Sequence, residues 1–382
     1  MDNLADALAN TARADDGTYR PEILRPDRTE ECARLVSLLT VPGMRVHDTL
    51  HQQLRELVRT LSPDRSFSEE DLDRTAREHL KGTDPSVYGV WVYYPWSLQL
   101  VHLLDEAEFA MVRTDRNRNK IDREEQRELT RKKVGVIGLS VGQSVALTMT
   151  LERSFGEIRL ADFDDLELSN LNRIRTGLHA LGNNKVINVA REIAEIDPFL
   201  KVVCFTEGID RDNINAFLTG GGDLDILIEE CDSVDVKIYA RQHAKRLGIP
   251  VVMDTSDRGL VDVERFDLEP DRAILHGLIE DLDLTVIERP MTNLEKMPLL
   301  GRMVGMETLS DRMKQSLPEV GKTLVTWPQL ASGVVLGGSI VAEVARRVLL
   351  GIHQPSGRWW NDILPGSDTS ANLDTTRSLT EK

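Results

Sequence analysis

Cysteine is scarce in this sequence. Only three cysteines occur among the 382 residues, and Cys32, Cys204 and Cys231 are too far apart to form a C-x-x-C pair. Isolated cysteines in odd number argue against a disulfide framework and favour a reducing compartment, so we expect a cytoplasmic protein. The lack of paired cysteines also argues against a cysteine-bound zinc site.

Long apolar runs are missing as well. The most apolar stretch, residues 330–342, has 13 residues without charge before Glu343, whereas a membrane-spanning helix needs about 20. The first 16 residues contain neither a basic region nor an apolar run, so they do not resemble a secretory signal. We therefore expect a buried helix near residues 329–351 and no contact with a membrane.

Positive charge is in deficit. Lysine and arginine total 47 against 63 aspartates and glutamates, giving a net charge of −16. Duplex-binding proteins need a basic face, so no general nucleic-acid binding is expected, although a local basic pocket for phosphate is compatible with this composition. The hydrophobic share of 41% is sufficient for a core, and the length suggests two or three domains.

The first 130 residues predict a separate region. Apolar residues over 27–60 have helical spacing, Ser66 and Glu69 have the spacing of a helix-capping box, and alternation around Pro95 indicates a β-hairpin. We expect a flexible segment over residues 1–20 and a helical and hairpin accessory region over 21–130. A packing or dimer-contact role is favoured for this region over peptide binding.

From Lys132 onward, predicted strands and helices alternate. This pattern predicts an α/β fold, a doubly wound Rossmann-like and mostly parallel sheet with helices on both faces. We expect this domain to cover residues 131–355, followed by a polar tail over 356–382. The expected strands are 134–138, 156–164, 200–207, 225–232 and 249–255, and the expected helices are 142–154, 184–195, 213–218, 236–248 and 306–316.

A glycine turn joins the first strand of this domain to its first helix. Free N–H groups and the positive end of a helix make such a turn an anion site. The turn runs from Gly138 to Gln143 and departs from G-x-G-x-x-G, because Ser140 and Gln143 occupy the third and sixth positions. Asp162 ends the next strand, where a carboxylate can accept the ribose hydroxyls of a nucleotide. These features predict nucleotide binding without separating ATP from a dinucleotide.

Several cations follow Asp162, in the segment that contains Arg173 and Arg175 and at Lys185. Arginine offers phosphate two parallel hydrogen bonds and lysine a point charge, so this group favours a triphosphate over a dinucleotide. Asp232, at the end of a later strand, is placed to hold Mg²⁺ on the phosphates. Glu229 and Glu230 are alternative magnesium ligands.

The segment from Gly138 to Asp232 resembles the adenylating domain of the ThiF/MoeB-type, ubiquitin-activating-enzyme-like superfamily. The resemblance covers residues 134–265 and rests on the runs VIGLSVG, LADFDDLELSNLNR, EIDPFLKV and ILIEECDS. Its most specific part is the D-x-D-x(5)-N-x-x-R spacing, which is formed by Asp162, Asp164, Asn170 and Arg173.

The resemblance implies roles for individual residues. Asp162 would hold the ATP ribose, Arg173 and Lys185 would bind and polarise the phosphates together with Asn170, and Asp232 would coordinate Mg²⁺. The nucleotide-binding set would be Gly138, Gly142, Asp162, Asp164, Asn170, Arg173 and Lys185.

The resemblance also implies an arginine that reaches the γ-phosphate from an N-terminal segment, often across a homodimer. Among Arg113, Arg116 and Arg118 we favour Arg116. Arg173, Asp232 and Arg116 would then be the catalytic residues. The implied reaction is attack of a carboxylate on the α-phosphate, which gives an acyl-adenylate and pyrophosphate.

Departures from the family pattern refine this expectation. Ser140, Val141 and Gln143 replace usual glycines of the turn, which would narrow the pocket. The loop after residue 255, where some members carry a thioester-forming cysteine, has none, and Arg258 in that loop could orient the acceptor carboxylate. Cys231 lies within a predicted strand as a small core residue. We therefore expect direct capture of the acyl-adenylate.

Three functions stay open at this point. The first is an adenylyltransferase acting on a carrier-protein C-terminus, a ribosomally made peptide, a modified nucleoside or a small acid, with peptide or small-molecule tailoring favoured. The second is an NAD(P)-dependent oxidoreductase that uses the same turn, and it assigns no role to Arg173 or Lys185. The third is a non-catalytic partner subunit of an activating complex.

Overall fold

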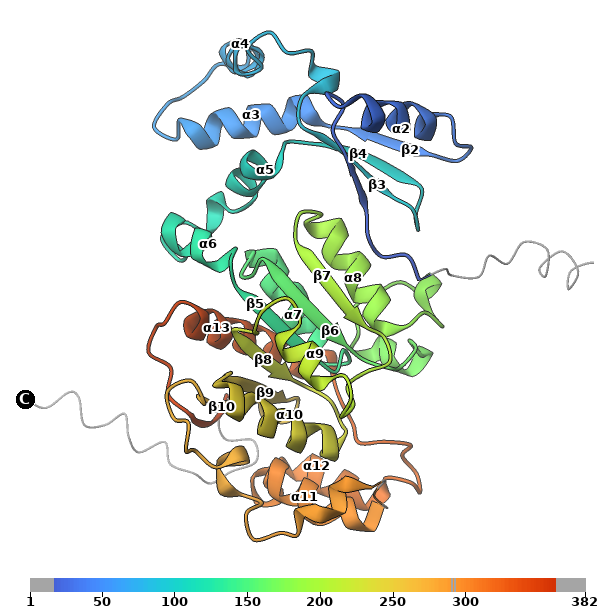
Figure 1. Ribbon diagram of the computed structural model, residues 1–382, viewed down its shortest axis with the longest axis vertical. Coiled ribbons are helices and arrows are strands. Elements are labelled where there is room, and N and C mark those ends of the chain that lie inside the picture. Colours follow the sequence, from blue (N-terminus) through green and yellow to red (C-terminus); the bar gives the residue numbers. More distant parts are fainter. Residues whose placement is uncertain (1–16, 290, 292, 362–382) are drawn as a thin grey trace, which may run out of the picture.

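The computed structural model describes residues 17–289, 291 and 293–361. The predicted flexible segment lies largely outside these residues, as does the polar tail from residue 362 onward. Two sheets organise the chain: a four-stranded sheet of order β1-β3-β4-β2 and a seven-stranded sheet of order β11-β10-β9-β8-β5-β6-β7. Figure 1 shows the smaller sheet at the top, the larger one in the middle, and α11 and α12 at the bottom.

The smaller sheet forms the accessory region. The predicted hairpin is confirmed, because β3 pairs antiparallel with β4 and Tyr94 lies opposite Gln99. One face of the sheet packs on α2, and Val92 and Tyr94 on the other face pack against Ala194 of the larger domain. The elements are β1 (Glu22–Leu24), α2 (Thr29–Leu39), β2 (Arg45–Asp48), α3 (Leu50–Leu61), α4 (Glu69–His79), β3 (Val90–Tyr94) and β4 (Gln99–Leu103).

One local prediction in this region is confirmed and one is wrong. The two apolar runs with helical spacing in residues 27–60 form α2 and α3, and the unpredicted strand β2 lies between them and pairs in parallel with β4. The cap of α4 is Ser68 rather than Ser66, since the Ser68 hydroxyl accepts the Asp71 N–H at 3.1 Å. Here α4 begins at Glu69, so Ser66 precedes the cap by two residues.

The larger sheet confirms the doubly wound, mostly parallel fold. Strands β7, β6, β5, β8 and β9 run parallel, whereas β10 and β11 extend the sheet antiparallel. Since β11 pairs with β10, this sheet continues past residue 355. The strands are β5 (Lys133–Ile137), β6 (Glu157–Ala161), β7 (Lys201–Phe205), β8 (Ile226–Glu229), β9 (Val251–Thr255), β10 (Leu260–Glu264) and β11 (Gly357–Trp360).

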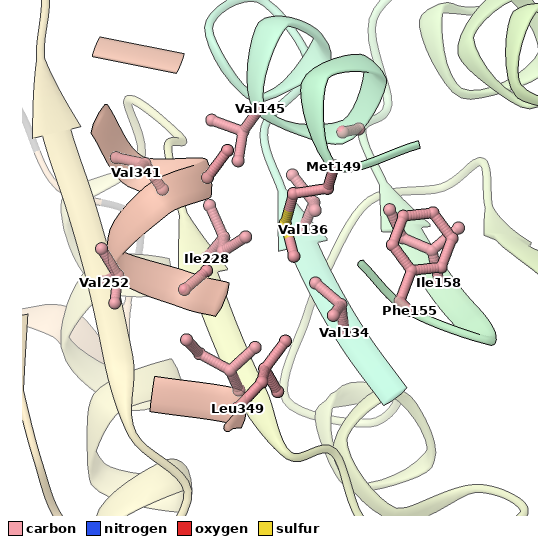
Figure 2. Packing of buried hydrophobic residues seen from close by; sticks show 14 of the residues in the cluster. Val134, Val136, Val145, Met149, Phe155, Ile158, Ile228, Val252, Val341 and Leu349 are labelled. Carbon is pink, nitrogen blue, oxygen red and sulfur yellow. The ribbon is translucent and has the colours of Figure 1, made fainter. Parts of the chain in front are cut away.

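Helices cover both faces of this sheet. On one face pack α7 (Gly142–Glu152), α8 (Lys185–Ile196) and α13 (Ala331–Leu349); on the other pack α9 (Ile214–Thr219) and α10 (Val234–Leu247). Figure 2 shows Val145 and Met149 of α7 and Val341 of α13 directed toward Val136 and Ile228 of the central strands. The inner strands β5, β6, β8, β9 and β10 are therefore buried on both sides, as their apolar sequences predict, whereas the edge strands β7 and β11 are partly exposed.

The apolar stretch near the C-terminal end of the domain forms α13, and its inner residues are buried as predicted. Glycines let this helix approach its neighbours closely: a Cβ at Gly337 would lie 1.8 Å from Asp254 Oδ2, and one at Gly338 would lie 2.3 Å from Ser144 Oγ. Across the described part of the chain, no helix combines the length and apolarity needed to cross a bilayer.

The remaining helices connect and border these layers. Between the two sheets lie α5 (Glu106–Arg113) and α6 (Arg123–Leu129), and beside α10 lie α11 (Asn293–Val304) and α12 (Asp311–Ser316). The predicted helix over 306–316 is interrupted, because a 3₁₀ turn over Met306–Thr308 precedes α12 and Ser310 caps α12. Its cap forms because the Ser310 hydroxyl accepts the N–H of Met313 at 3.2 Å.

Candidate nucleotide site

The candidate site lies where the order of the strands reverses. β5 stands between β6 and β8, and Ile137 at its end lies opposite both Ala161 and Glu229. The residues that follow these three strands, Gly138, Asp162 and the segment 230–232, therefore meet at one edge of the sheet. In open α/β sheets the ligand crevice lies at this reversal, outside the carboxyl ends of the strands.

The glycine turn keeps glycine at the two positions where the backbone requires it. Gly138 has φ +87°, and a Cβ there would lie 2.7 Å from the Cα of Cys231. Gly142 begins α7, and a Cβ there would lie 2.7 Å from Val136 Cγ1, so glycine lets α7 pack closely on β5. The non-glycine residues Ser140 and Gln143 occupy neither of these positions.

Asp162 is fixed beside this turn. Its Oδ2 accepts the Leu139 N–H at 2.6 Å, and its Oδ1 accepts the Asp164 N–H at 2.9 Å. Burial raises the pKa of this carboxyl, while the Lys185 charge and both N–H groups act in the opposite direction. Each oxygen retains a second lone pair, which leaves acceptor capacity for the hydroxyls of a ribose.

Lys185 and Asp164 form a pair at the start of α8. The Lys185 Nζ lies 2.7 Å from Asp164 Oδ2, and the lysine side chain is buried whereas the aspartate is half exposed. Asp164 therefore orients Lys185 instead of facing a nucleotide by itself. Asn170 is also buried, and its Oδ1 accepts the Glu167 N–H at 3.0 Å. The group that Asn170 offers a phosphate is thus its amide nitrogen.

Arg173 lies against the glycine turn. Its Nε donates to Ser140 Oγ at 2.9 Å, and its Nη1 donates to Asn172 Oδ1 at 2.9 Å. Both partners are neutral, and among the residues that the structure describes, no carboxylate forms a salt bridge with Arg173. Burial lowers the pKa of Arg173, and the charge of Asp232 opposes that effect. An anion at the turn would supply the missing charge partner.

Asp232 follows β8 at the same edge and is exposed to solvent. Surrounding protein atoms raise the pKa of its carboxyl, whereas the positive charges of Lys237, Arg173 and Lys185 lower it. Mg²⁺ is usually bound by one or two carboxylates together with substrate phosphates, so a single exposed carboxylate fits this ion. Over the described ranges, no three His, Cys, Asp or Glu side chains gather around a common metal position.

The alternative magnesium ligands are engaged elsewhere. Glu229 is fully buried between Lys237 and Arg241, and although burial raises its pKa, these two charges lower it to about 2. Glu230 is buried too, and its Oε1 accepts the Asp254 N–H at 3.0 Å. Both glutamates therefore shape the strand end instead of facing a ligand. Lys237, a buried lysine in the first turn of α10, had no signal in the sequence.

The structure places Arg113, Arg116 and Arg118 away from this site. Arg113 donates to the Thr150 carbonyl at 2.7 Å, and Asn117 donates to the Glu152 carbonyl at 3.0 Å, so this segment lies at the opposite end of α7. α7 has 11 residues, and at 1.5 Å per residue it separates the two ends by about 16 Å. Within one chain this segment does not reach the glycine turn, so Arg116 stays a prediction for a contribution from a partner subunit.

Two further expectations change in the structure. Gln143 was expected to narrow the pocket, and its buried side chain instead contacts Arg175 and Glu192. Arg258, which was expected to orient a carboxylate, donates from Nη1 to the Thr308 carbonyl at 2.8 Å. It therefore ties the loop between β9 and β10 to the segment before α12.

Comparison with known proteins gives a family for this arrangement. A sequence model of the ThiF family matches residues 114–306, half of the chain. The uncharacterized protein MT1398 of Mycobacterium tuberculosis is 42% identical over 91% of this chain and 46% of its own length. The tRNA threonylcarbamoyladenosine dehydratase of Bacillus subtilis is 27% identical over 40% of this chain and 60% of its own length. The chain thus spans about half of these relatives.

Solved structures give more distant matches. The Escherichia coli tRNA threonylcarbamoyladenosine dehydratase TcdA with AMP has a TM-score of 0.46 and 17% identity over 65% of this chain and 98% of that protein. E. coli MccB has a TM-score of 0.45 and 13% identity over 80% of this chain and 79% of that protein.

The fold is a doubly wound α/β fold with a glycine turn where the order of the strands reverses. The chain belongs to the ThiF family. This assignment rests on the match of the family model, and it confirms the resemblance drawn from the sequence.

Proposed function

We propose that this protein is an ATP-dependent adenylyltransferase that activates a substrate carboxylate. The observation that carries the proposal is Arg173, which lies against the glycine turn at the same strand edge as Asp162 and whose hydrogen-bond partners in the described part of the chain are neutral. A dinucleotide site of the same fold has no need of this arginine, whereas a triphosphate has charge to neutralise there.

The residues divide the work of binding. Asp162 would accept the ribose hydroxyls, and the N–H groups of the turn at the start of α7 would face the phosphates. Arg173 and Lys185 would neutralise phosphate charge and hold the triphosphate in line. Asp232 would hold Mg²⁺, which supplies further charge neutralisation when it is bound. Catalysis would come mainly from positioning and electrostatic stabilisation.

The proposed reaction balances as a nucleotidyl transfer. An oxygen of the substrate carboxylate attacks the α-phosphorus, and a bond from that oxygen to phosphorus forms. The bond between the α-phosphorus and the oxygen that bridges to the β-phosphate breaks, and pyrophosphate leaves. The product is an acyl-adenylate, whose carbonyl carbon is then open to a nucleophile.

Direct capture of the acyl-adenylate fits the cysteines of this chain. The loop from Asp254 to Asp262 contains no cysteine. Cys231 lies at the site, yet burial raises the pKa of its thiol well above the usual value, so little thiolate forms near neutral pH. The acceptor would be an amine, a hydroxyl, a sulfur donor or a group within the substrate, and we favour peptide or small-molecule tailoring in the cytoplasm by a homodimer.

Calorimetric titration of ATP with Mg²⁺ tests the proposal, with NAD and NADPH as controls. We expect wild-type protein to bind ATP, and we expect Arg173→Ala to weaken binding by about 2 kcal/mol, the scale of a lost charged hydrogen-bond partner. Asp64→Ala, an exposed aspartate of the accessory region, serves as the matched control and should leave binding unchanged.

Two outcomes would contradict the proposal. If the protein binds NADPH and does not bind ATP, the oxidoreductase hypothesis replaces the proposal. Binding of neither nucleotide would favour a non-catalytic subunit whose site is completed in a complex.

A further inference from the structure

We propose that Ser140 and Gln143, two of the three residues that replace usual glycines of the turn, are positioning residues for Arg173. They would hold the loop that follows the 3₁₀ turn η3 (Leu168–Asn172), so that Arg173 meets the phosphates without first becoming ordered. We call the contacts of Ser140 and Gln143 with this loop the clamp. Its effect on phosphate binding rests on the proposed ATP site, whereas its effect on the order of the loop does not.

The Gln143 side chain hydrogen-bonds the backbone of the loop at Arg175. Its Oε1 accepts the Arg175 N–H at 3.0 Å, and its Nε2 donates to the Arg175 carbonyl at 3.3 Å. The same Nε2 donates to Glu192 Oε2 of α8 at 2.8 Å, and the glutamine side chain is almost completely buried. A glycine at position 143 would make none of these three contacts.

Ser140 contacts the side chain of Arg173, which lies two positions before Arg175 in the loop. Its hydroxyl accepts the Arg173 Nε–H at 2.9 Å, which leaves the outer nitrogens of the guanidinium for other partners. One of these, Nη1, donates to Asn172 Oδ1. Both departures from glycine therefore contact the same short loop, one through its backbone and one through Arg173.

This loop needs such support because it has little regular structure. Between η3 and the next 3₁₀ turn, η4 (Leu178–Ala180), residues 173–177 belong to no helix or strand. A long arginine side chain loses much rotamer freedom when it binds a ligand, and pre-ordering it removes part of that cost. Replacing either clamp residue by glycine should thus weaken phosphate binding selectively.

The test compares ATP with AMP, because Arg173 would address phosphates that AMP lacks. We expect Gln143→Gly to weaken calorimetric ATP binding by about tenfold, the scale of one to two lost hydrogen bonds, and to change AMP binding less than twofold. Gln143→Met, which retains the volume of the side chain without its polar atoms, should behave alike. In an Arg173→Ala background neither change should cause a further loss. Thr148→Val on α7 is the matched control.

Hydrogen exchange and a swap variant separate positioning from simple destabilisation. We expect amides of residues 173–176 to exchange faster in Gln143→Gly and at the wild-type rate in Thr148→Val. The double variant Gln143→Glu with Glu192→Gln exchanges the amide and the carboxylate of one contact, so it should recover most of the ATP affinity that Gln143→Glu alone loses.

Different outcomes would contradict the positioning of Arg173 and the clamp on the loop. Equal losses for ATP and AMP, or a loss that adds to that of Arg173→Ala, would show that Gln143 stabilises the fold without positioning Arg173. Unchanged exchange of residues 173–176 would disprove the clamp. If wild-type protein binds no ATP, the proposed function and the positioning role both fail, and the exchange rates still decide the clamp.

Discussion

Arginines lie near both ends of α7, but they differ in whether a carboxylate pairs with them. At its C-terminal end Arg153 and Arg113 surround the buried Asp197, with Arg153 Nε 2.9 Å and Arg113 Nη1 3.8 Å from the Asp197 Oδ2. Near its N-terminal end, Arg173 hydrogen-bonds the neutral Ser140 and Asn172, and among the described residues it forms no salt bridge. One cluster is neutralised within the protein, and the other has positive charge without a paired carboxylate.

This difference separates a structural arginine from one that is set to bind a ligand. A buried charge is retained only when it is paired, so the Asp197 cluster carries its own counter-charge and holds the accessory region to the α/β domain. An arginine next to a helix N-terminus with neutral partners gains its counter-charge from an anion. Substitutions at the C-terminal end of α7 should therefore change stability, and substitutions at its N-terminal end should change nucleotide binding.

The largest effect is expected at the structural end. Asp197→Ala removes the buried counter-charge of Arg153, which then keeps only its ion pair with the exposed Glu106, and Arg113 loses its carboxylate partner as well. We expect the free energy of unfolding to fall by about 3–5 kcal/mol, as measured by urea denaturation. ATP affinity of the protein that stays folded should be unchanged. A loss of ATP affinity at full folding, or a stability change no larger than that of the exposed control Asp64→Ala, would contradict the comparison.

The next effect concerns Asp254, a carboxyl behind the nucleotide end with which no cation of the described residues forms a salt bridge. Both its oxygens are buried, without a hydrogen-bond partner in the described structure, and burial raises its pKa to about 7, although Glu230 and the Lys237 charge act to lower it. A raised pKa means that the folded state holds a proton that the unfolded state releases near pH 4, so this group lowers stability as pH rises from about 4 to about 7.

Asp254→Asn removes that dependence. We expect the variant to match wild type near pH 4 and to exceed it above pH 7 by an amount on the order of a few kcal/mol, at about 1.4 kcal/mol per unit of pKa shift. Thermal or urea unfolding across pH 4–8 measures this difference, with the exposed Asp271→Asn as control. A difference that is constant with pH, or largest at pH 4, would rule out this assignment.

The smallest effect is expected for Arg116→Ala. Arg116 is exposed and lies with Arg113 at the far end of α7. We expect unfolding free energy to change by less than about 0.5 kcal/mol, as for other surface substitutions, and ATP affinity of a monomeric preparation to stay at the wild-type value. Urea denaturation measures the unfolding free energy, and titration calorimetry at low and high protein concentration measures the ATP affinity. A loss of affinity that appears only on dimerisation would instead place Arg116 at the site of the neighbouring subunit.

Local sequence features predicted most of the fold. Strands such as β5 and β8 are short apolar runs between turn residues, and α8 ends at Ile196, where Asp197 and Pro198 follow. These signals depend on neighbouring residues alone, so a single sequence displays them. β2 was missed because its partner β4 is more than fifty residues away, and no local pattern reports a distant pairing.

The candidate site was predictable in its residues and less so in its contacts. The order of strands implies that Gly138, Asp162 and Asp232 meet at one edge, and the structure places them there. The sequence could not show that Asp164 is engaged by Lys185, or that Glu229 is neutralised by Lys237. Those pairs join segments whose distance is set by helix packing.

By itself, the sequence determined the alternation of strands and helices, the glycine turn, the run of polar residues after β6 and the absence of a cysteine in the later loop. Only the tertiary structure decided which charged residues are neutralised and which face the crevice. The physical reason is that spacing along a chain fixes the conformation of a turn, whereas the charge state and role of Arg113, Arg173 or Glu229 depend on partners brought close by packing. Gln143 illustrates this: as a sequence it is a lost glycine, and in the fold it clamps the loop that carries Arg173.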